Sequence, residues 1–172
     1  MTDKKRRATI SAVGHFVPED ILSNADLEKM VDTTDEWIRT RTGISERRIL
    51  RNGATSDLAA GAALAALRNR GMRPEDVEVI IVATVTPDMF FPATACIVQD
   101  KIGARHAWGF DLSAACSGFV YAVVLGSQLI ETGAYSRVLV IGADKMSAIT
   151  DYSDRNNCIL FGDAGAAILL EP

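Results

Sequence analysis

The chain has 172 residues, of which 48% are hydrophobic, and its formal net charge is −4. This length suits one domain of about 100–200 residues, and the hydrophobic share excludes an intrinsically disordered chain. An acidic balance argues against nucleic-acid binding, since the one basic cluster is a short run at residues 4–7. We expect a cytoplasmic protein, because no secretory signal is visible and the longest apolar run is shorter than the ~18 residues of a membrane span.

The three cysteines, Cys96, Cys116 and Cys158, are an odd number with wide spacing. Disulfide frameworks use even counts, and zinc sites use close pairs such as Cys-x-x-Cys. We therefore expect free thiols and no metal site.

Helical signals dominate the first part of the chain, after a β-type run at residues 8–13. Ser23 begins a capping box that predicts a helix to about residue 30. Thr34 begins a second short helix, which Gly43 can end in a left-handed conformation. An alanine-rich helix follows and runs to Arg70, with Thr55 or Ser56 as the expected cap.

Strands and helices alternate over the remaining sequence. Residues 77–85 are nearly all apolar and rich in β-branched side chains, which predicts a strand buried on both faces. The further elements expected are helices at 92–101 and 117–132 and strands at 107–111, 137–141 and 166–170. This alternation predicts an α/β layered domain with a largely parallel sheet.

The helix expected at residues 117–132 is apolar almost all round. A helix without a polar face is typical of the middle of a large protein. Because 172 residues provide few layers to cover it, we expect the chain alone to expose apolar surface and to associate.

Cys116 is the strongest candidate for a reactive side chain. It follows a buried strand and a turn of small residues, and it stands where the apolar helix begins. Unpaired N–H groups and the macrodipole at a helix N-terminus favour a thiolate. A small buried side chain is the alternative interpretation, and position alone leaves both open. Cys96 and Cys158 lack this strand–turn–helix setting.

Three motifs together resemble the β-ketoacyl-acyl-carrier-protein synthase III family. They are the Ala-Ala-Cys-Ser-Gly-Phe run at residues 114–119, the segment 24–38 with residues 41–44, and the Phe-Gly-Asp turn at residues 161–167. The similarity runs in register from about residue 8 to the end. At Ala164 the family more often has glycine.

The resemblance implies a thiolase-like layered fold of two similar halves, each with a mostly parallel mixed sheet and helices on both faces. Residues 1–172 match the amino-terminal half, so the carboxy-terminal half is expected to be absent from this chain. The family forms homodimers. It holds no permanently bound cofactor, and a coenzyme A thioester is its substrate.

The implied reaction is the initiating condensation of fatty-acid synthesis. An acyl-CoA donates its acyl group to Cys116, and malonyl-acyl-carrier protein then yields β-ketoacyl-acyl-carrier protein, CO2 and coenzyme A. A related acyl-CoA condensing enzyme of secondary metabolism is an alternative. The sequence does not give the length of the primer.

Further roles follow from the resemblance alone. Trp37 and Arg155 match the residues that cover the two faces of the coenzyme A adenine. Thr33 matches a residue that hydrogen-bonds the adenine, and Arg41 matches one near the phosphates. The alternatives are an ordinary half-buried tryptophan and solvated arginines.

Two phenylalanines are expected at the acyl pocket. Phe91 matches a residue that crosses the dimer interface and lines the partner's pocket, although a plain core phenylalanine is an alternative interpretation. Phe161 matches a phenylalanine beside the active site.

In the family, a histidine and an asparagine of the second half work with the cysteine during condensation. This sequence has His15 and His106, which we interpret as structural. The chain alone is thus expected to lack the condensation residues, and a separate carboxy-terminal half is a possible partner. An inactive fragment that binds coenzyme A or a partner half is the non-enzymatic alternative.

Overall fold

The fold is described from a computed structural model, which places residues 6–172. Lys4 and Lys5 of the basic cluster lie outside the described residues. Across the described range, no helix combines the length and the apolar character that crossing a bilayer requires.

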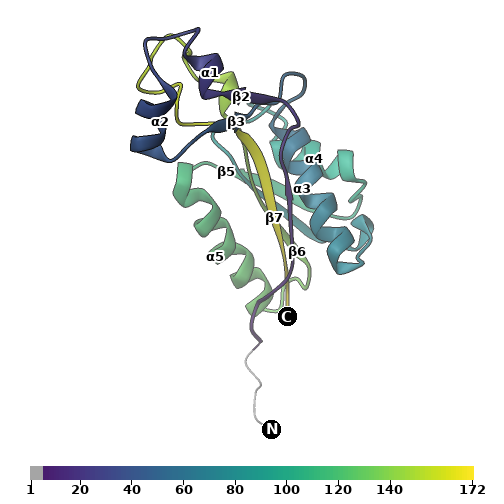
Figure 1. The fold of residues 1–172 in the computed structure, drawn as a ribbon. Coiled ribbons are helices and arrows are strands. Elements are labelled where there is room, and N and C mark those ends of the chain that lie inside the picture. Colours follow the sequence, from purple (N-terminus) through teal and green to yellow (C-terminus); the bar gives the residue numbers. More distant parts are fainter. Residues whose placement is uncertain (1–5) are drawn as a thin grey trace.

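A five-stranded sheet forms the centre of the fold (Figure 1). Its strands stand in the order β1-β7-β6-β4-β5, and their bounds are β1 Thr9–Phe16, β4 Val79–Ala83, β5 Trp108–Leu112, β6 Val138–Lys145 and β7 Asp163–Glu171. β4 pairs in parallel with β5 and β6, whereas β7 pairs antiparallel with β6 and with β1. Every strand except β7 therefore runs in the same direction, and the predicted mixed, mostly parallel sheet is confirmed.

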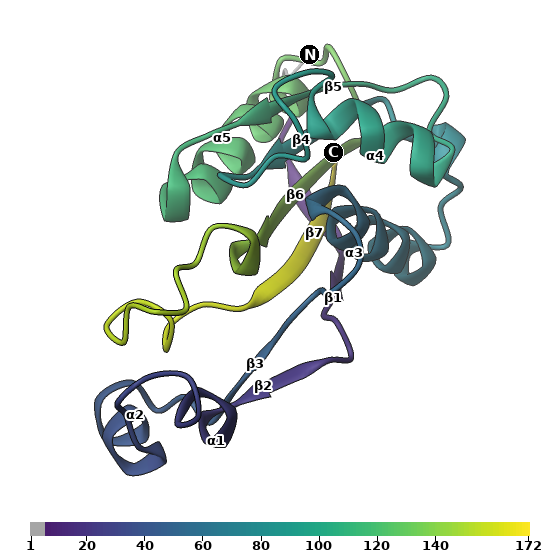
Figure 2. The ribbon, with the colours of Figure 1, turned by 90° about the horizontal axis from the view of Figure 1, so that it is seen from above.

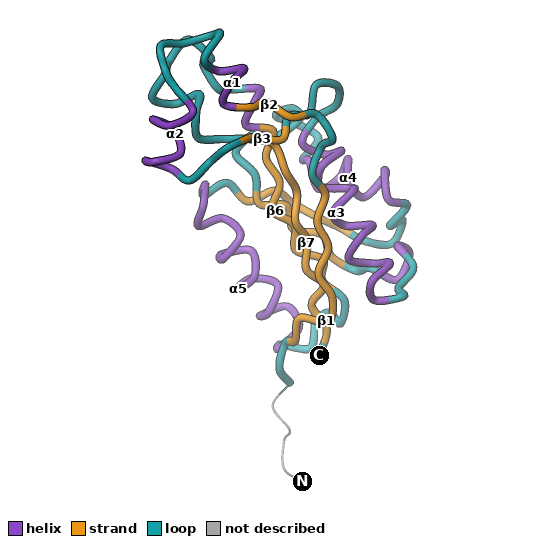
Figure 3. Tube along the Cα trace, in the orientation of Figure 1, coloured by secondary structure: helices purple, strands orange, loops and turns teal. Residues whose placement is uncertain are grey.

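Helices cover both faces of this sheet (Figure 3). α3 (Thr55–Arg70) and α4 (Thr94–Ile102) lie on one face, and α5 (Gly118–Glu131) lies on the other. The side chains of β4 alternate between the two layers: Ile80 and Val82 pack in the cluster that includes α3 and α4, whereas Val79 and Ile81 pack with α5. All of β4 is buried, which confirms the predicted two-faced strand.

α3 approaches the sheet closely because small residues meet at the contact. A Cβ atom on Gly14 of β1 would lie 2.2 Å from the backbone nitrogen of Ala66, and one on Gly165 of β7 would lie 2.5 Å from the carbonyl oxygen of Leu58. The alanine-rich sequence of α3 thus serves close packing on β1 and β7.

A small lobe stands beside the main sheet (Figure 2). It contains β2 (Ile21–Ser23), α1 (Asn24–Leu27), α2 (Asp35–Thr42) and β3 (Glu46–Arg48). β2 and β3 pair antiparallel. The sequence signals did not predict these two strands.

The predicted caps of the lobe are confirmed. The Ser23 hydroxyl accepts the backbone N–H of Asp26 at 3.2 Å, and the Asp26 carboxylate accepts the N–H of Ser23 at 3.2 Å. Thr34 caps α2 by accepting the N–H of Trp37 at 3.1 Å, and Gly43 ends it with φ of 74°. The first helix is shorter than expected, since it ends at Leu27.

The predicted cap of α3 is wrong. Ala54 occupies the capping position, and the Asp57 carboxylate accepts its N–H at 2.8 Å. Thr55 lies inside the helix and donates its hydroxyl to the carbonyl oxygen of Thr86, and Ser56 donates to Asp88. Both hydroxyls therefore hold the loop after β4 and not the helix end.

α5 buries one side and exposes the other, although the side chains on both sides are mostly apolar. Its residues at four-residue spacing face the sheet and are buried, namely Gly118, Ala122, Gly126 and Ile130. The opposite side exposes between 43% and 59% of Val120, Tyr121, Val124 and Leu125. We call these four residues the outer face of α5.

Candidate active site

Cys116 lies at the junction between β5 and α5. β5 ends at Leu112, a 3₁₀ turn covers Ala115–Ser117, and α5 begins at Gly118. The predicted strand–turn–helix setting is therefore confirmed. Cys116 is exposed, whereas Cys158 is buried and Cys96 is partly buried. The interpretation of Cys116 as a small core side chain is wrong.

The backbone beside Cys116 is strained. Ala115 has φ of 47°, and within residues 6–172 no other non-glycine residue has a positive φ. A non-glycine residue in such a sparsely populated region costs about 1–3 kcal/mol, and such residues cluster at functional sites. The bend at Ala115 presents the neighbouring thiol at the surface.

The N-terminus of α5 stands open next to the thiol. Among the described residues, no side chain caps this helix. The N–H of Gly118 donates to the carbonyl oxygen of Ala115 within the 3₁₀ turn, and the positive end of the helix macrodipole favours a nearby anion.

A cavity of about 310 Å³ opens over Cys116. It lies at the carboxyl ends of β4 and β6 and at the start of β7, which is where α/β sheets commonly bind ligands. Besides Cys116, its walls are Ala83, Ala115, Phe119, Gly142, Ala143, Asp144, Met146, Gly162 and Ala164. These side chains are mostly small or apolar, so the cavity suits an acyl group.

Asp144 is a residue of this cavity that the sequence analysis did not find. Its Oδ1 atom accepts hydrogen bonds of 2.8–3.2 Å from the hydroxyls and N–H groups of Thr84, Val85 and Thr86. It thereby ties the end of β6 to the loop that carries Phe91. An acidic residue three positions after the apolar run at residues 137–141 was the available signal.

The Phe-Gly-Asp motif is a structural junction. The Asp163 carboxylate is 1% exposed. It accepts the N–H of Leu50 at 2.7 Å, the N–H of Ser147 at 2.8 Å and the Ser147 hydroxyl at 2.6 Å. Gly162 lines the Cys116 cavity, so the motif fixes one wall. Phe161, the first residue of the motif, is 43% exposed.

Neither histidine lies beside Cys116. His106 is exposed and precedes β5, whereas Cys116 follows that strand. His15 lies exposed on β1, and β1 and β5 are the opposite edges of the sheet. The interpretation of both residues as structural stays a prediction.

Trp37 contacts two arginine side chains. It stands on the first turn of α2, and the guanidinium carbon of Arg41 is 4.4 Å from its ring centroid. The guanidinium carbon of Arg155, far away in the sequence, is 4.7 Å from the same centroid. Both distances are typical of cation–π contacts. The structure thus brings together three of the residues predicted to bind coenzyme A.

Thr33 precedes the residue that caps the Trp37 helix. Its hydroxyl oxygen is buried and has no hydrogen-bond partner among the described residues. A buried hydroxyl without a partner is rare in folded proteins and calls for a bound group or water. Arg155 also approaches Asp32, at 3.7 Å between Nη1 and Oδ2.

Phe91 does not belong to the core. It is 85% exposed, and its neighbours Phe90 and Met89 are 105% and 50% exposed. The alternative of a plain core phenylalanine is therefore wrong. The loop that carries Phe91 joins β4 to α4. It ends near β5, because the N–H groups of Thr94 and Ala95 at the start of α4 donate to the Asp111 carboxylate of β5 at 2.7 and 2.8 Å.

A larger cavity of about 650 Å³ lies between the small lobe and the end of β6. It is lined by apolar side chains together with Asp26, Arg51, Lys145, Ser147 and Tyr152, and no cysteine lines it. No group of three or more His, Cys, Asp or Glu side chains within residues 6–172 is arranged to hold a metal ion.

Comparison with known sequences identifies relatives of this chain. The family model described as 3-oxoacyl-[acyl-carrier-protein (ACP)] synthase III matches residues 110–172, which include Cys116 and β7. The β-ketoacyl-[acyl-carrier-protein] synthase III of Chlorobium phaeovibrioides is 60% identical over 167 residues, which are 96% of this chain and 51% of that relative.

Solved structures share the fold of this chain. The 3-oxoacyl-[acyl-carrier-protein] synthase III of Aquifex aeolicus VF5 superposes with a TM-score of 0.94 at 47% identity, over 96% of this chain and 54% of that one. The priming β-ketosynthase of the R1128 polyketide biosynthetic pathway superposes with a TM-score of 0.94 at 33% identity, over 100% of this chain and 52% of that one.

The mixed sheet, its helix layers and the cysteine at the β5–α5 junction define a protein of the thiolase-like fold. Within this class, the predicted resemblance to β-ketoacyl-acyl-carrier-protein synthase III is confirmed over nearly the whole chain. The chain spans about half the length of the curated relatives that it matches.

Proposed function

We propose that this chain supplies the acyl-accepting cysteine and the coenzyme A site of an enzyme that initiates fatty-acid synthesis. The observation that carries the proposal is the exposed Cys116, which follows a strained Ala115 and stands at the uncapped N-terminus of α5. The names of the relatives support the same reaction class.

The first half-reaction is transfer of an acyl group from coenzyme A to Cys116. The Sγ thiolate attacks the thioester carbonyl carbon, and negative charge develops on the carbonyl oxygen. Backbone N–H groups near Cys116 are suited to stabilise that charge. The intermediate then collapses, the bond to the coenzyme A sulfur breaks, and coenzyme A leaves as its thiol after taking up a proton.

Coenzyme A recognition is proposed for the region around Trp37. The indole offers a large stacking surface, and Arg155 offers a planar cation that can stack on the other face of an adenine. The buried Thr33 hydroxyl has no partner within residues 6–172, which makes it the candidate to hydrogen-bond the base. Arg41 is exposed and carries the positive charge expected near phosphates.

The second half-reaction, condensation with malonyl-acyl-carrier protein, is proposed to use residues outside this chain. His15 lies on β1, the edge strand opposite β5, and His106 precedes β5, whereas Cys116 follows it. These positions support this part of the proposal. Residues 1–172 would then be the amino-terminal half of a two-part site, completed by a carboxy-terminal half. A cytoplasmic location stays a prediction.

A homodimer is part of the proposal. β5 is an edge strand, and an open edge next to exposed aromatic side chains is a ready surface for a second copy. Phe91, at 85% exposure, would leave solvent by entering the partner's acyl pocket. Pocket size would then set the length of the primer.

The related enzyme of secondary metabolism is the second candidate. The R1128 priming β-ketosynthase superposes as well as the Aquifex aeolicus enzyme does, with a TM-score of 0.94 for each. Its identity to this chain is lower, at 33% against 47%. The sequence comparison therefore favours the fatty-acid reaction.

A burst of free coenzyme A tests the proposal. Mixing the chain with acetyl-CoA is expected to release about one coenzyme A per chain, because the acyl-enzyme accumulates when no malonyl-acyl-carrier protein is present. Cys116→Ala should abolish the burst, and Cys96→Ala should keep it. A burst that survives in Cys116→Ala contradicts the nucleophile assignment, and no burst in the wild type favours the non-enzymatic alternative.

A further inference from the structure

A buried arginine joins the two segments that meet at Trp37. Arg47 lies on β3 and exposes 4% of its surface. Its Nε and Nη2 atoms donate to the carbonyl oxygen of Ile159 at 2.9 and 2.5 Å. Its Nη1 atom donates to Oδ1 of Asn24 at 2.6 Å. One guanidinium thereby connects β3, α1 and the segment that leads into β7.

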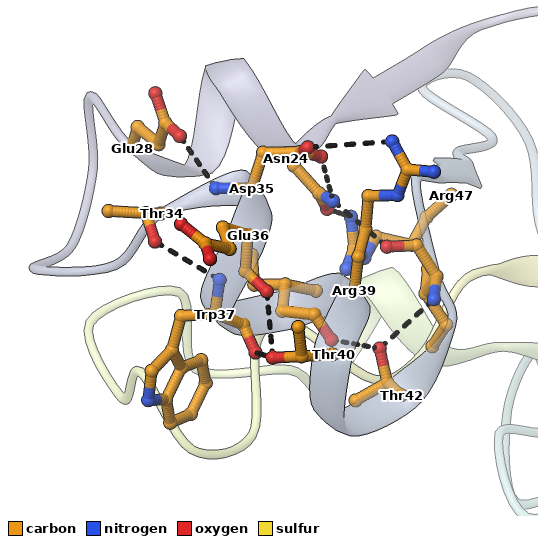
Figure 4. Close-up of polar contacts among 12 residues, drawn as sticks. Asn24, Glu28, Thr34, Asp35, Glu36, Trp37, Arg39, Thr40, Thr42 and Arg47 are labelled. Carbon is orange, nitrogen blue, oxygen red and sulfur yellow. Dashed lines mark hydrogen bonds and ion pairs between the residues drawn. The ribbon is translucent and has the colours of Figure 1, made fainter.

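Asn24 extends this connection to α2. It is 1% exposed, and its Nδ2 atom donates to Oδ1 of Asp35 at 2.7 Å and to the carbonyl oxygen of Ile44 at 2.9 Å (Figure 4). Asp35 is the first residue of α2, and Ile44 follows the glycine that ends it. The helix that carries Trp37 and Arg41 is therefore held near both ends.

Ile159 is the corresponding anchor on the other side. It lies four positions after Arg155 and two before Phe161. Ile159 and Cys158 share a buried cluster with Leu27 and Ile38, and Trp37 packs against that cluster. Arg47 thus fixes the backbone from which the Arg155 side chain reaches the indole.

Burying the charged guanidinium of Arg47 costs free energy. Burial lowers the pKa of Arg47, and its two direct partners are a neutral carbonyl and a neutral amide. Apolar side chains commonly replace buried charges without loss of stability. What an apolar side chain or a lysine lacks is a planar fork that bonds acceptors in two directions. The geometry of the Arg47 guanidinium is therefore better suited to aligning the segments that it bonds than to raising the stability of the fold.

We infer that Arg47 is a positioning residue for the proposed coenzyme A site: its hydrogen bonds to Ile159 and Asn24 align Arg155 with Trp37 so that both can stack on one adenine. The inference rests on the proposed function. A ring between them needs roughly 7 Å, two spacings of about 3.5 Å, so the Arg155 side chain swings outward while its backbone stays anchored.

The test compares two acyl donors on the intact chain. Acetyl-CoA carries the adenine, whereas S-acetyl-N-acetylcysteamine delivers the same acetyl group without a nucleotide. The rate of Cys116 acetylation is measured for each donor in the wild type, Arg47→Met and Arg47→Lys. Arg48→Met is the matched control, because Arg48 lies next to Arg47 on β3 but bonds Pro18, Glu19 and Glu46.

Both Arg47 variants are expected to slow acetylation by acetyl-CoA at least about tenfold, since small misplacements of binding groups have effects of this size or larger. Acetylation by the short thioester should stay unchanged, and Arg48→Met should match the wild type with both donors. If Arg47→Met does not fold, Arg47→Lys retains the charge and tests the same point.

Two outcomes overturn the inference. Equal slowing with both donors would mean that Arg47 only supports the fold, and no slowing with either donor would mean that it does not align the adenine site. A wild type that does not prefer acetyl-CoA over the short thioester would contradict the proposed coenzyme A site itself. The failure of the inference and the failure of the proposed function are therefore distinguishable.

Discussion

At the scale of residues, substitution of Trp37 tests the proposed coenzyme A site. Stacking of a base on an aromatic side chain contributes about 1–3 kcal/mol by alanine substitution. Trp37→Ala is therefore expected to weaken coenzyme A binding by about fivefold to 150-fold, measured by calorimetry. Trp108→Phe is the control, since Trp108 lies on β5 against Phe110 and Tyr135. Equal affinity of Trp37→Ala and the wild type would contradict this assignment.

The sequence predicted some site residues for physical reasons and others only by resemblance. The setting of Cys116 followed from a buried strand, small turn residues and an apolar helix. The approach of Arg155 to Trp37 followed from no spacing rule and came from the matched motifs alone. Arg47 was missed because an arginine in a Glu-Arg-Arg run looks solvated, and its burial depends on contacts with Asn24 and Ile159.

At the scale of elements, the Ser23 capping box makes α1 sensitive to acid. Hydrogen bonds from Ser23 and Lys29 lower the pKa of Asp26 from 3.8 to about 2. A carboxyl whose pKa is lower in the folded state stabilises the fold above its unfolded pKa, and this contribution is lost as the pH falls through the folded value. The window for Asp26 is therefore from about pH 4 to about pH 2.

Asp26→Asn is expected to lower the melting temperature at pH 7, and its difference from the wild type should shrink as the pH falls through that window. Circular dichroism melting at several pH values measures it. Asp100→Asn, at an exposed position of α4, is the control and should change little. A difference that stays constant down to pH 2 would count against the role of the carboxylate.

Long, strongly patterned elements were predictable, and short ones were not. The apolar strand β4 and the helix α5 have enough residues for their pattern to decide the structure. β2 and β3 have three residues each, and Glu46-Arg47-Arg48 has no β signal of its own. The cap of α3 was misassigned because Thr55 and Ser56 bond the loop near Thr86 and Asp88, a tertiary contact that local sequence does not encode.

At the scale of the whole molecule, the outer face of α5 is an exposed apolar surface. Its four apolar side chains are each at least 43% exposed, and contiguous apolar surface of this kind promotes association. The double variant Val120→Lys and Val124→Lys is expected to shift the chain toward monomer in sedimentation velocity. Gln128→Lys lies one turn further along and adds charge without removing apolar surface, so it should associate like the wild type.

A wild-type chain that stays monomeric at all concentrations would contradict this expectation. Association that is unchanged in the double variant would instead assign contact between copies to another surface, such as the β5 edge near Phe91.

The layered fold was predictable at this scale because strands and helices alternate along the chain. The position of β7 between β1 and β6 was not, because pairing order depends on long-range contacts.

The central claim is that Cys116 accepts the acyl group, and the location of that group tests it most directly. After incubation with acetyl-CoA, peptide mapping by mass spectrometry reports the acetyl content of Cys96, Cys116 and Cys158 in one sample. The account predicts a thioester on Cys116 and none on the other two cysteines. Acetyl on Cys96 or Cys158 with Cys116 unmodified would contradict it.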